Sequence, residues 1–231
     1  MIAGTIGLLD RPVDDPLESQ SSSGFSTLDV RETQTAITSD APIQTGRVCA
    51  TVESRDEDIA VYGTTIDVET VAGQQRVWTP WVADVTDAGF VAAERTRGEF
   101  PFDVFWSATG RRVEPATIDV AGIIKTFRDG DRDIDTWMVG SSEGGAEMRY
   151  HTHARPAAAA RADIGVGFEL PWSGTTARGV MYEGGYVAIY SGGWGATKFA
   201  AFITDVILPH ADVVDETAEQ QTLDGDTEVD A

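Results

Sequence analysis

The sequence predicts an α+β fold of mostly antiparallel strands, sandwich-like or barrel-like, with flexible N- and C-terminal arms. Three observations lead to this class. Runs rich in β-branched and aromatic residues follow one another, separated by Gly and Asp turns. Helical patterns appear only after groups of strands, which disfavours a doubly wound parallel sheet. The stretches 86–106 and 182–202 resemble each other, which suggests two related sheet-plus-helix halves.

The chain carries far more acid than base. Its 231 residues include 38 Asp and Glu against 17 Lys and Arg, so the formal net charge is −21, and the only lysines are Lys125 and Lys198. Concentrated salt screens such self-repulsion, because the Debye length is about 3 Å at 1 M. We interpret the chain as a protein of a halophilic archaeon or its virus. An ordinary acidic protein with an acidic tail is the alternative.

Charge and hydropathy also argue against two classes of partner. The chain lacks a basic stripe that would release counterions from DNA or RNA, so no nucleic-acid partner is expected. The apolar N-terminus has no basic segment and reaches Asp10 early. No apolar run approaches the length of about 18 residues that a membrane helix needs. We expect neither a signal peptide nor a membrane span, and a cytoplasmic or virion location.

The first part of the chain divides into an arm and a strand-rich half. Residues 1–46 predict an N-terminal arm, because 11–46 are polar and have only short strand-like runs. Residues 47–130 predict a β-rich half with helices. We expect its strands at 47–54, 58–71 and 75–85, and a further strand after a turn at Gly89.

Two helices are predicted at the end of this half. Phe102, Phe105 and Trp106 recur at helical spacing. The second helix places four apolar residues on one face: Val120, Ile123, Ile124 and Phe127. Thr117 can cap its start and Gly130 its end.

Charged and Gly-rich residues at 128–145 predict the junction between the halves. Residues 146–210 predict a second β-rich half, with a hairpin that turns at 183–185 and a C-terminal helix that Pro209 ends. The helix has one apolar stripe: Phe199, Phe202, Ile203, Val206 and Ile207. Residues 211–231 contain eight acids and no base, and predict a disordered acidic tail.

The two similar stretches can be aligned with one or two gaps. Residues 76–81 face 167–172, and 87–92 face 183–188 at an offset of 96. The aromatic pair Phe102 and Phe105 faces Phe199 and Phe202. A duplication would explain this, and so would the Gly turns and aromatic anchors that unrelated hairpin-plus-helix units share. Both explanations stay open.

Candidate chemistry is sparse, and no catalytic, cofactor-binding or metal-binding residue is assigned. His151 and His153 on one strand face could reach a single metal ion, but nothing identifies a third ligand, so a polar strand face is the preferred interpretation. The turn 191–198 has the wrong spacing for a phosphate loop. On that turn Trp194 suits a contact if exposed, or packs over its own sheet. Cys49 is expected to be a buried, inert thiol.

These observations favour a non-enzymatic structural or assembly protein, for example a tail or capsid-associated subunit of a virion. Long polar ends, strand-rich halves and the missing catalytic signature are the reasons, and we expect self-association or protein partners. Two alternatives remain: a metal-dependent enzyme that uses His151 and His153, and a soluble module that binds a ligand or partner at residues 191–198.

Overall fold

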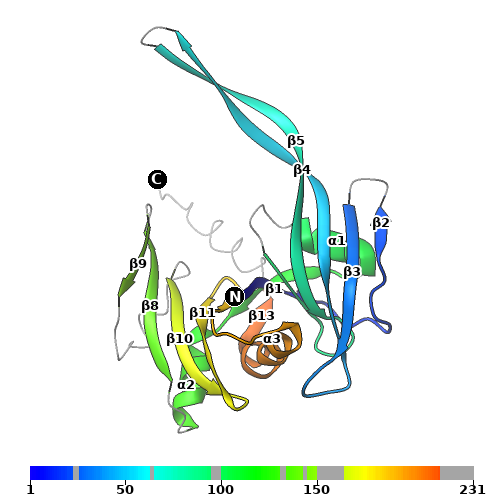
Figure 1. Ribbon diagram of the computed structural model, residues 1–231, viewed down its shortest axis with the longest axis vertical. Coiled ribbons are helices and arrows are strands. Elements are labelled where there is room, and N and C mark those ends of the chain that lie inside the picture. The colour runs from blue at the N-terminus through cyan, green and yellow to red at the C-terminus, as the bar shows by residue number, and fades with distance from the viewer. Residues whose placement is uncertain are drawn as a thin grey trace, which may run out of the picture.

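In the computed structural model, antiparallel strands form one large sheet with helices packed on it (Figure 1). The structure describes residues 1–22, 26–62, 65–94, 100–130, 134–142, 145–149 and 164–213. In order across the sheet, the strands are β2 (Gln20–Ser22), β3 (Ser26–Thr35), β4 (Pro42–Tyr62), β5 (Thr65–Asp84), β6 (Phe90–Ala93), β1 (Ile2–Leu9), β12 (Tyr186–Ile189), β11 (Thr175–Tyr182), β10 (Ile164–Trp172), β8 (Asp135–Ser142) and β9 (Gly145–Arg149). The mostly antiparallel α+β class is confirmed. The described strands form an open sheet, so the sandwich or barrel detail is not.

The first strand lies at the centre of the sheet, and this corrects the expectation of a flexible N-terminal arm. β1 pairs antiparallel with β6 on one side and with β12 on the other. Ile6 on this strand is completely buried, and Gly7 lies where a side chain would meet the Phe102 ring at 2.7 Å. Short apolar residues and glycines therefore place this segment inside the molecule, although its length and polar sequel resemble an arm.

The polar segment that follows β1 is also tied to the sheet. The buried Gln44 side chain on β4 accepts a hydrogen bond from the Leu17 N–H at 2.8 Å and donates one to the Leu17 carbonyl at 2.9 Å. The Gln44 amide thus makes the two backbone hydrogen bonds that a paired strand would otherwise make with Leu17. Buried amides that satisfy backbone groups hold a segment firmly, because an unpaired partner would carry the full desolvation penalty.

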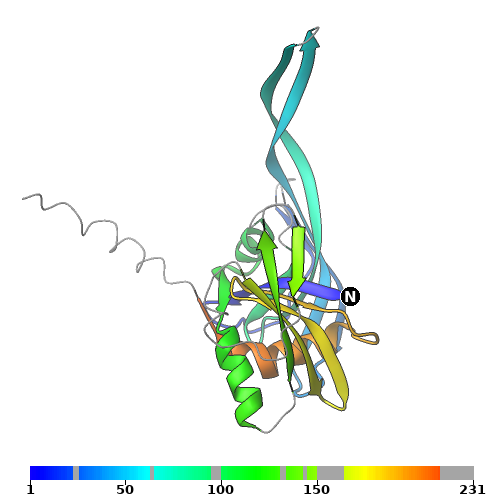
Figure 2. The same cartoon turned by 90° about the vertical axis from the view of Figure 1, so that its left-hand side faces the viewer.

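The three strands expected between residues 47 and 85 are two long strands. β4 and β5 pair without interruption from Gln44 and Ala83 to Tyr62 and Thr65. Because β3 pairs with β4 only as far as Ala50 and β6 pairs with β5 only from Trp81, the far part of the hairpin stands alone. We call residues 51–62 and 65–76 the ribbon. It projects away from the body in both views (Figures 1 and 2).

Helix α1 (Phe100–Thr109) packs on the first half and confirms the helix expected there. Phe105 is fully buried and meets the Trp81 ring edge-on, with the ring centroids 5.2 Å apart. Trp106, expected on the same stripe, is instead 54% exposed. The buried stripe of α1 is narrower than the spacing of its aromatic residues suggested. Successive helix residues are rotated by about 100°, so Trp106 points away from the face that buries Phe105.

Helix α3 (Ala196–Phe202) closes the second half in the same way. It continues as a π-helical turn at Ile203–Ile207 and a 3-10 turn at Leu208–His210, which contains Pro209. All five residues of the expected stripe are buried. Phe202 stacks on Phe168 of β10 at 5.8 Å and meets Trp172 edge-on at 5.6 Å. The predicted C-terminal helix is confirmed.

The two helices cover opposite faces of the sheet. Phe90 packs in the core cluster that contains α3, whereas its neighbour Val91 packs in the cluster that contains α1. Consecutive strand residues point to opposite faces, so the helices cannot share one. Since β6 and β12 both run antiparallel to β1, half a turn about β1 would interchange the β5–β6–α1 and β11–β12–α3 units. The α1 and α3 units are therefore arranged alike on the two faces of a single sheet.

The sequence alignment of the halves holds for the hairpin and helix but is wrong one strand earlier. Val91 and Val187, which the offset of 96 aligns, each face the helix of their own half. Residues 76–81 lie on β5, however, and 167–172 lie on β10 rather than on β11. The aromatic residue that contacts the helix therefore lies on strands that do not correspond in the two halves. Trp81 of β5 lies opposite Gly46 of β4, whereas Phe168 of β10 lies opposite Gly179 of β11. Whether a duplication produced this symmetry stays a prediction.

Helix α2 (Val120–Asp129) buries the four apolar residues predicted for it. Its N-cap is Asp119, whose carboxylate accepts a hydrogen bond from the Gly122 N–H at 2.8 Å. Thr117, the expected cap, belongs to β7 (Val113–Ile118), which pairs with β1 and with β13 (Ala211–Val213). Gly130 ends the helix as predicted.

Two segment boundaries also change. The junction expected at 128–145 contains β8, which pairs with β10, and β13 occupies the first residues of the expected acidic tail. Residues 150–163 and 214–231 lie outside the described residues.

Asp84 gives a pH-dependent prediction. It is buried at the β5–β6 turn, and its carboxylate accepts a hydrogen bond from the Asp87 N–H at 3.0 Å. Burial raises its pKa above the ordinary value of 3.8, although hydrogen bonds from the Asp87 and Ala88 backbone act in the opposite direction. The folded state then holds the proton more tightly than the unfolded state. The resulting contribution to stability is complete below pH 3.8 and is lost as the pH rises through the folded pKa.

Asp84→Asn keeps an acceptor oxygen and removes the buried charge. We expect it to raise the urea midpoint at about pH 7 and to change it little near pH 3. The exposed Asp40→Asn serves as the control. Equal effects of Asp84→Asn at both pH values would contradict the assignment.

Candidate functional site

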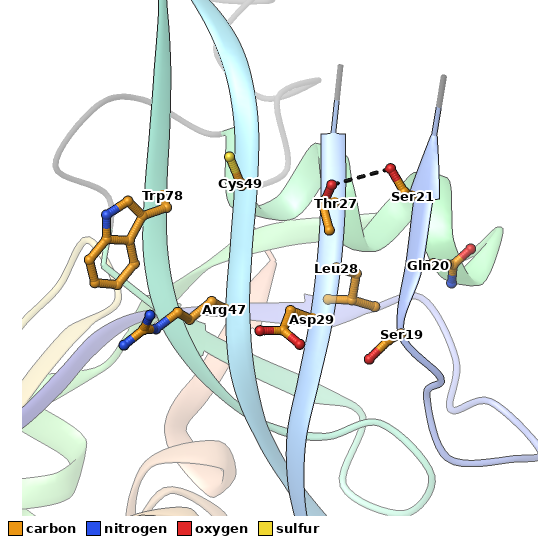
Figure 3. Close-up of a pocket in the computed structure, with 9 residues that line it drawn as sticks. All are labelled: Ser19, Gln20, Ser21, Thr27, Leu28, Asp29, Arg47, Cys49 and Trp78. Atoms are coloured by element: carbon orange, nitrogen blue, oxygen red, sulfur yellow. Dashed lines mark hydrogen bonds between the residues drawn. The ribbon is translucent and has the colours of Figure 1, made fainter. Parts of the chain in front are cut away.

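A groove of about 630 Å³ crosses the sheet at the root of the ribbon (Figure 3). Four neighbouring strands or their flanks line it. The lining residues are Ser19, Gln20, Ser21, Thr27, Leu28, Asp29, Arg47, Cys49 and Trp78. The groove lies on the face of β3–β5 that α1 does not cover, because the alternate residues Val48, Ala50 and Val77 face α1.

Trp78 and Arg47 form one side of the groove. The Trp78 side chain is 57% exposed, and the Arg47 guanidinium carbon lies 4.6 Å from the centre of its ring. A cation over an indole face is favourable by about 0.5–1 kcal/mol at an exposed site. Figure 3 shows both side chains standing off the strands rather than packing between them. Trp and Arg are among the residue types most enriched at the energetic centres of protein interfaces.

The other side of the groove is polar and borders the sheet edge. The Ser21 and Thr27 hydroxyls are 3.3 Å apart, and the Arg31 Nε contacts an Asp29 carboxylate oxygen at 2.8 Å. The Gln20 side chain donates to the Ala108 carbonyl at 3.1 Å, which ties the edge strand β2 to the end of α1. These bonds order a short edge strand whose outer backbone groups pair with no described strand.

Cys49 does not lie in the core, where the sequence predicted it. It lies directly opposite Trp78 in the strand register and is only partly buried, so it lines the groove rather than the core. The sequence around Cys49 is apolar because its neighbours Val48 and Ala50 face α1, whereas Cys49 itself lies on the opposite face of the strand.

The uncovered face of the second half carries tyrosines. Val180 and Ala188 form a small cluster on the face opposite α3, with Tyr182 and Tyr186 packed against it at a ring separation of 5.9 Å. Tyr190, the residue after β12, is 48% exposed. Burial raises the pKa values of Tyr186 and Tyr190 above the ordinary value of 10.0, so both phenols keep their proton at neutral pH. Each half thus presents aromatic side chains on the face its helix leaves open.

A second cavity, of about 640 Å³, lies between α2 and the turns after α3. His210 Nε2 is 3.2 Å from the Thr126 hydroxyl, and burial raises the pKa of Asp205. Trp172 and Val206 form the apolar part of the cavity wall. Within the described parts of the chain, no group of three or more His, Cys, Asp and Glu side chains is placed to hold a metal ion.

The sequence-derived candidates fall in different places. His151 and His153 lie outside the described residues. The turn before α3 leads into a helix of only seven residues with no side-chain cap. Trp194 is partly buried, stacks on Trp172 at 5.3 Å and has the Lys198 ammonium 5.0 Å from its ring centre. It therefore packs over its own sheet, which was the second of its two interpretations.

Among the tryptophans whose burial the structure describes, Trp78 and Trp106 are exposed, and sequence reasoning missed both. A signal was present for Trp78: Trp78 and Trp81 are an odd number of residues apart on one strand, so both cannot face the core. Trp81 is 2% exposed and takes the core position.

No helix within the described ranges is both long enough and apolar enough to cross a membrane. Comparison of the chain with protein families, curated proteins and solved structures finds no match in any of the three.

Proposed function

We propose that this protein is a non-enzymatic structural subunit that assembles with copies of itself through the ribbon. The observation that carries the proposal is the ribbon itself. It continues two strands of the sheet by twelve residues on each side, 51–62 and 65–76, and no other described strand pairs with it. At about 3.3 Å per residue it reaches roughly 40 Å beyond the body.

A free two-stranded ribbon is at best marginally stable in water, because too few groups are buried to offset the ordering of its backbone. A ribbon of this length is therefore expected to be stabilised by contact with another molecule. The groove with Trp78, the tyrosine face and the edge strands β2 and β9, each paired on one side only among the described strands, are further surfaces that support an assembly role. The charge composition supports work in concentrated salt, and a virion of a halophilic archaeal virus is our proposed setting.

Two alternatives come from other classes. A metal-dependent enzyme would rest on His151 and His153, which lie outside the described residues. A binding module would use the cavity beside His210 rather than residues 191–198. Metal content and molecular mass separate all three.

The test compares the full chain with a variant that keeps only the first three residue pairs of the ribbon. Glu53 and Gln74 lie opposite each other, so an Asn-Gly turn between them replaces residues 54–73 without changing the register of the body. In about 2 M salt, where exposed charges are screened, light scattering should find a defined assembly for the full chain and a folded monomer for the variant.

A full chain that stays monomeric over the whole concentration range would contradict the proposal. So would a variant that assembles like the full chain. A monomer with stoichiometric metal, lost in His151→Ala, would favour the enzyme.

A further inference from the structure

The cavity beside His210 is separate from the groove at the root of the ribbon. It lies between α2 and the turns that follow α3, has a volume of about 640 Å³ and shares no lining residue with the groove. Figure 2 shows α2 at the surface of the second half, beside those turns. All residues that line the cavity belong to the described part of the chain. Its volume falls in the range of about 300–1,000 Å³ that is usual for small-molecule sites.

The β10–β11 hairpin forms one wall of this cavity. Trp172 and Thr175 pair across the hairpin, and the two residues between them, Ser173 and Gly174, both have positive φ. Trp172 and Ser173 line the cavity. The Trp172 ring stacks on Trp194 with the ring centroids 5.3 Å apart, and this contact holds the wall in one position.

His210 forms another part of the wall, and α2 holds it in place. Its backbone carbonyl accepts a hydrogen bond from the Asp119 N–H at 2.8 Å, and its Nε2 is 3.2 Å from the Thr126 hydroxyl. The ring lies against the first turn of α2, since a β-carbon on Gly122 would be 2.9 Å from its Nδ1. The imidazole is therefore fixed before a ligand arrives, so binding does not have to order it.

A π-helical turn supplies the third part of the wall. The turn runs from Ile203 to Ile207, which are both fully buried, and Asp205 and Val206 between them line the cavity. Turns of this kind are rare and are found frequently at functional sites. Here the turn places a carboxyl group beside an apolar surface.

The Asp205 carboxyl group lacks a protein partner. Among the described residues, no hydrogen bond or ion pair reaches it. It keeps contact with solvent, yet the surrounding groups withdraw part of its water and raise its pKa above the ordinary value of 3.8. A positively charged group that binds here would supply the missing partner.

The other charges near the cavity do not fill this role. His210 is the second titratable group in the lining, and no Lys or Arg is among the described lining residues. Lys125, Arg128 and Asp129 lie at exposed positions of α2 and do not line the cavity. Concentrated salt screens such exposed charges over a distance of a few ångströms, so the groups in direct contact with a ligand decide its charge.

These features favour an organic cation over a metal ion or an anion. One carboxylate and one imidazole are too few to hold a metal ion, and no group of three or more ligating side chains occurs in the described residues. An anion would lie against an unpaired carboxylate, which repels it. The apolar wall of Phe127, Trp172 and Val206 suits the hydrocarbon part of a molecule.

We propose that this cavity binds a small organic amine with an apolar body. The ammonium group pairs with the Asp205 carboxylate, the Thr126 and Ser173 hydroxyls supply further hydrogen bonds, and the apolar body lies against Trp172 and Val206. The site goes beyond the assembly function and does not depend on it, because none of its residues belongs to the ribbon or the groove.

Phenethylamine is the probe, and its neutral analogue phenethyl alcohol is the matched control ligand. Isothermal titration calorimetry of the full-length protein in about 2 M salt, which screens distant charges, measures both. We expect the amine to bind in the millimolar range or tighter. The alcohol should bind about fivefold more weakly, because it cannot form the charge-assisted hydrogen bond to the partly exposed Asp205.

Three variants locate the site. Asp205→Asn should weaken the binding of phenethylamine about fivefold and leave that of phenethyl alcohol unchanged. Asp212→Asn, exposed on β13 and outside the lining, should change neither. Thr126→Phe places a ring in the cavity from the exposed side of α2 and should abolish the binding of both, while urea unfolding checks that the variant folds.

Four results would overturn the inference. The first is a failure of phenethylamine to bind at tens of millimolar. The second is an equal loss of amine and alcohol in Asp205→Asn, since the carboxylate would then affect only the shape of the cavity. The third is a loss in Asp212→Asn as large as in Asp205→Asn, which would show attraction to the acidic surface as a whole. The fourth is unchanged binding in Thr126→Phe. The mass measurement tests the assembly function separately, so either proposal can fail alone.

Discussion

Truncation of Phe202 to alanine is expected to lower the free energy of unfolding by about 4 kcal/mol. Phe202 is completely buried, and three aromatic rings surround it: Phe168 stacks on it at 5.8 Å, and Trp172 and Trp194 meet it edge-on at 5.6 Å. These rings are rigid and cannot collapse into the space that the lost ring leaves. The cavity term therefore adds to the lost burial instead of being relieved by relaxation.

The measurement is urea unfolding at constant high salt, followed by tryptophan fluorescence and circular dichroism. Trp106→Ala is the matched control, since this aromatic residue is also on a helix but is 54% exposed, and we expect it to stay within about 0.5 kcal/mol of the parent. Phe105→Ala, at the corresponding place in the first half, should resemble Phe202→Ala.

Both truncations are also expected to shift one common transition, because β1 pairs with strands of both halves and neither half keeps a complete sheet without it. Two separate transitions, each moved by only one of the two truncations, would contradict this view of a single cooperative unit.

Gly46→Ala is expected to destabilise the protein by about 3 kcal/mol, at the upper end of the usual range for added core volume. A β-carbon at this position would collide with the backbone carbonyl oxygen of Asp29 and would lie 2.7 Å from a carbon of the Trp81 ring. The carbonyl belongs to the neighbouring strand and cannot rotate away without breaking the β3–β4 pairing. The ring is held in turn by Phe105 at 5.2 Å.

Gly192→Ala is the matched control, since no atom lies within 4 Å of the β-carbon it would add. Its unfolding midpoint should stay near that of the parent. Hydrogen exchange should show faster exchange in β3 and in residues 42–50 for Gly46→Ala and unchanged exchange in β10–β12. A neutral Gly46→Ala would mean that β3 and β4 lie further apart than the structure has them.

Local chemistry was readable from the sequence wherever short-range pattern decides the structure. The apolar stripes of α2 and α3, the end of α2 at Gly130 and the positive φ of 68° at Gly89 in the β5–β6 turn are all set within a few residues. The hairpin that joins β11 and β12 belongs to the same class. Excess negative charge and the rarity of lysine are likewise properties of the sequence alone.

Tertiary structure decided what depends on partners far away in the chain. Residues 2–9 resemble a free end, and only pairing with β6 and β12 makes them the central strand. Periodicity could not show that residues 51–76 would extend beyond the neighbouring strands, because that depends on where the pairing with β3 and β6 ends. Trp78 and Trp81 have similar neighbours in the sequence, but α1 covers one face and leaves the other open. The groove exists because of that difference, which arises from packing and cannot be seen in either residue's local sequence.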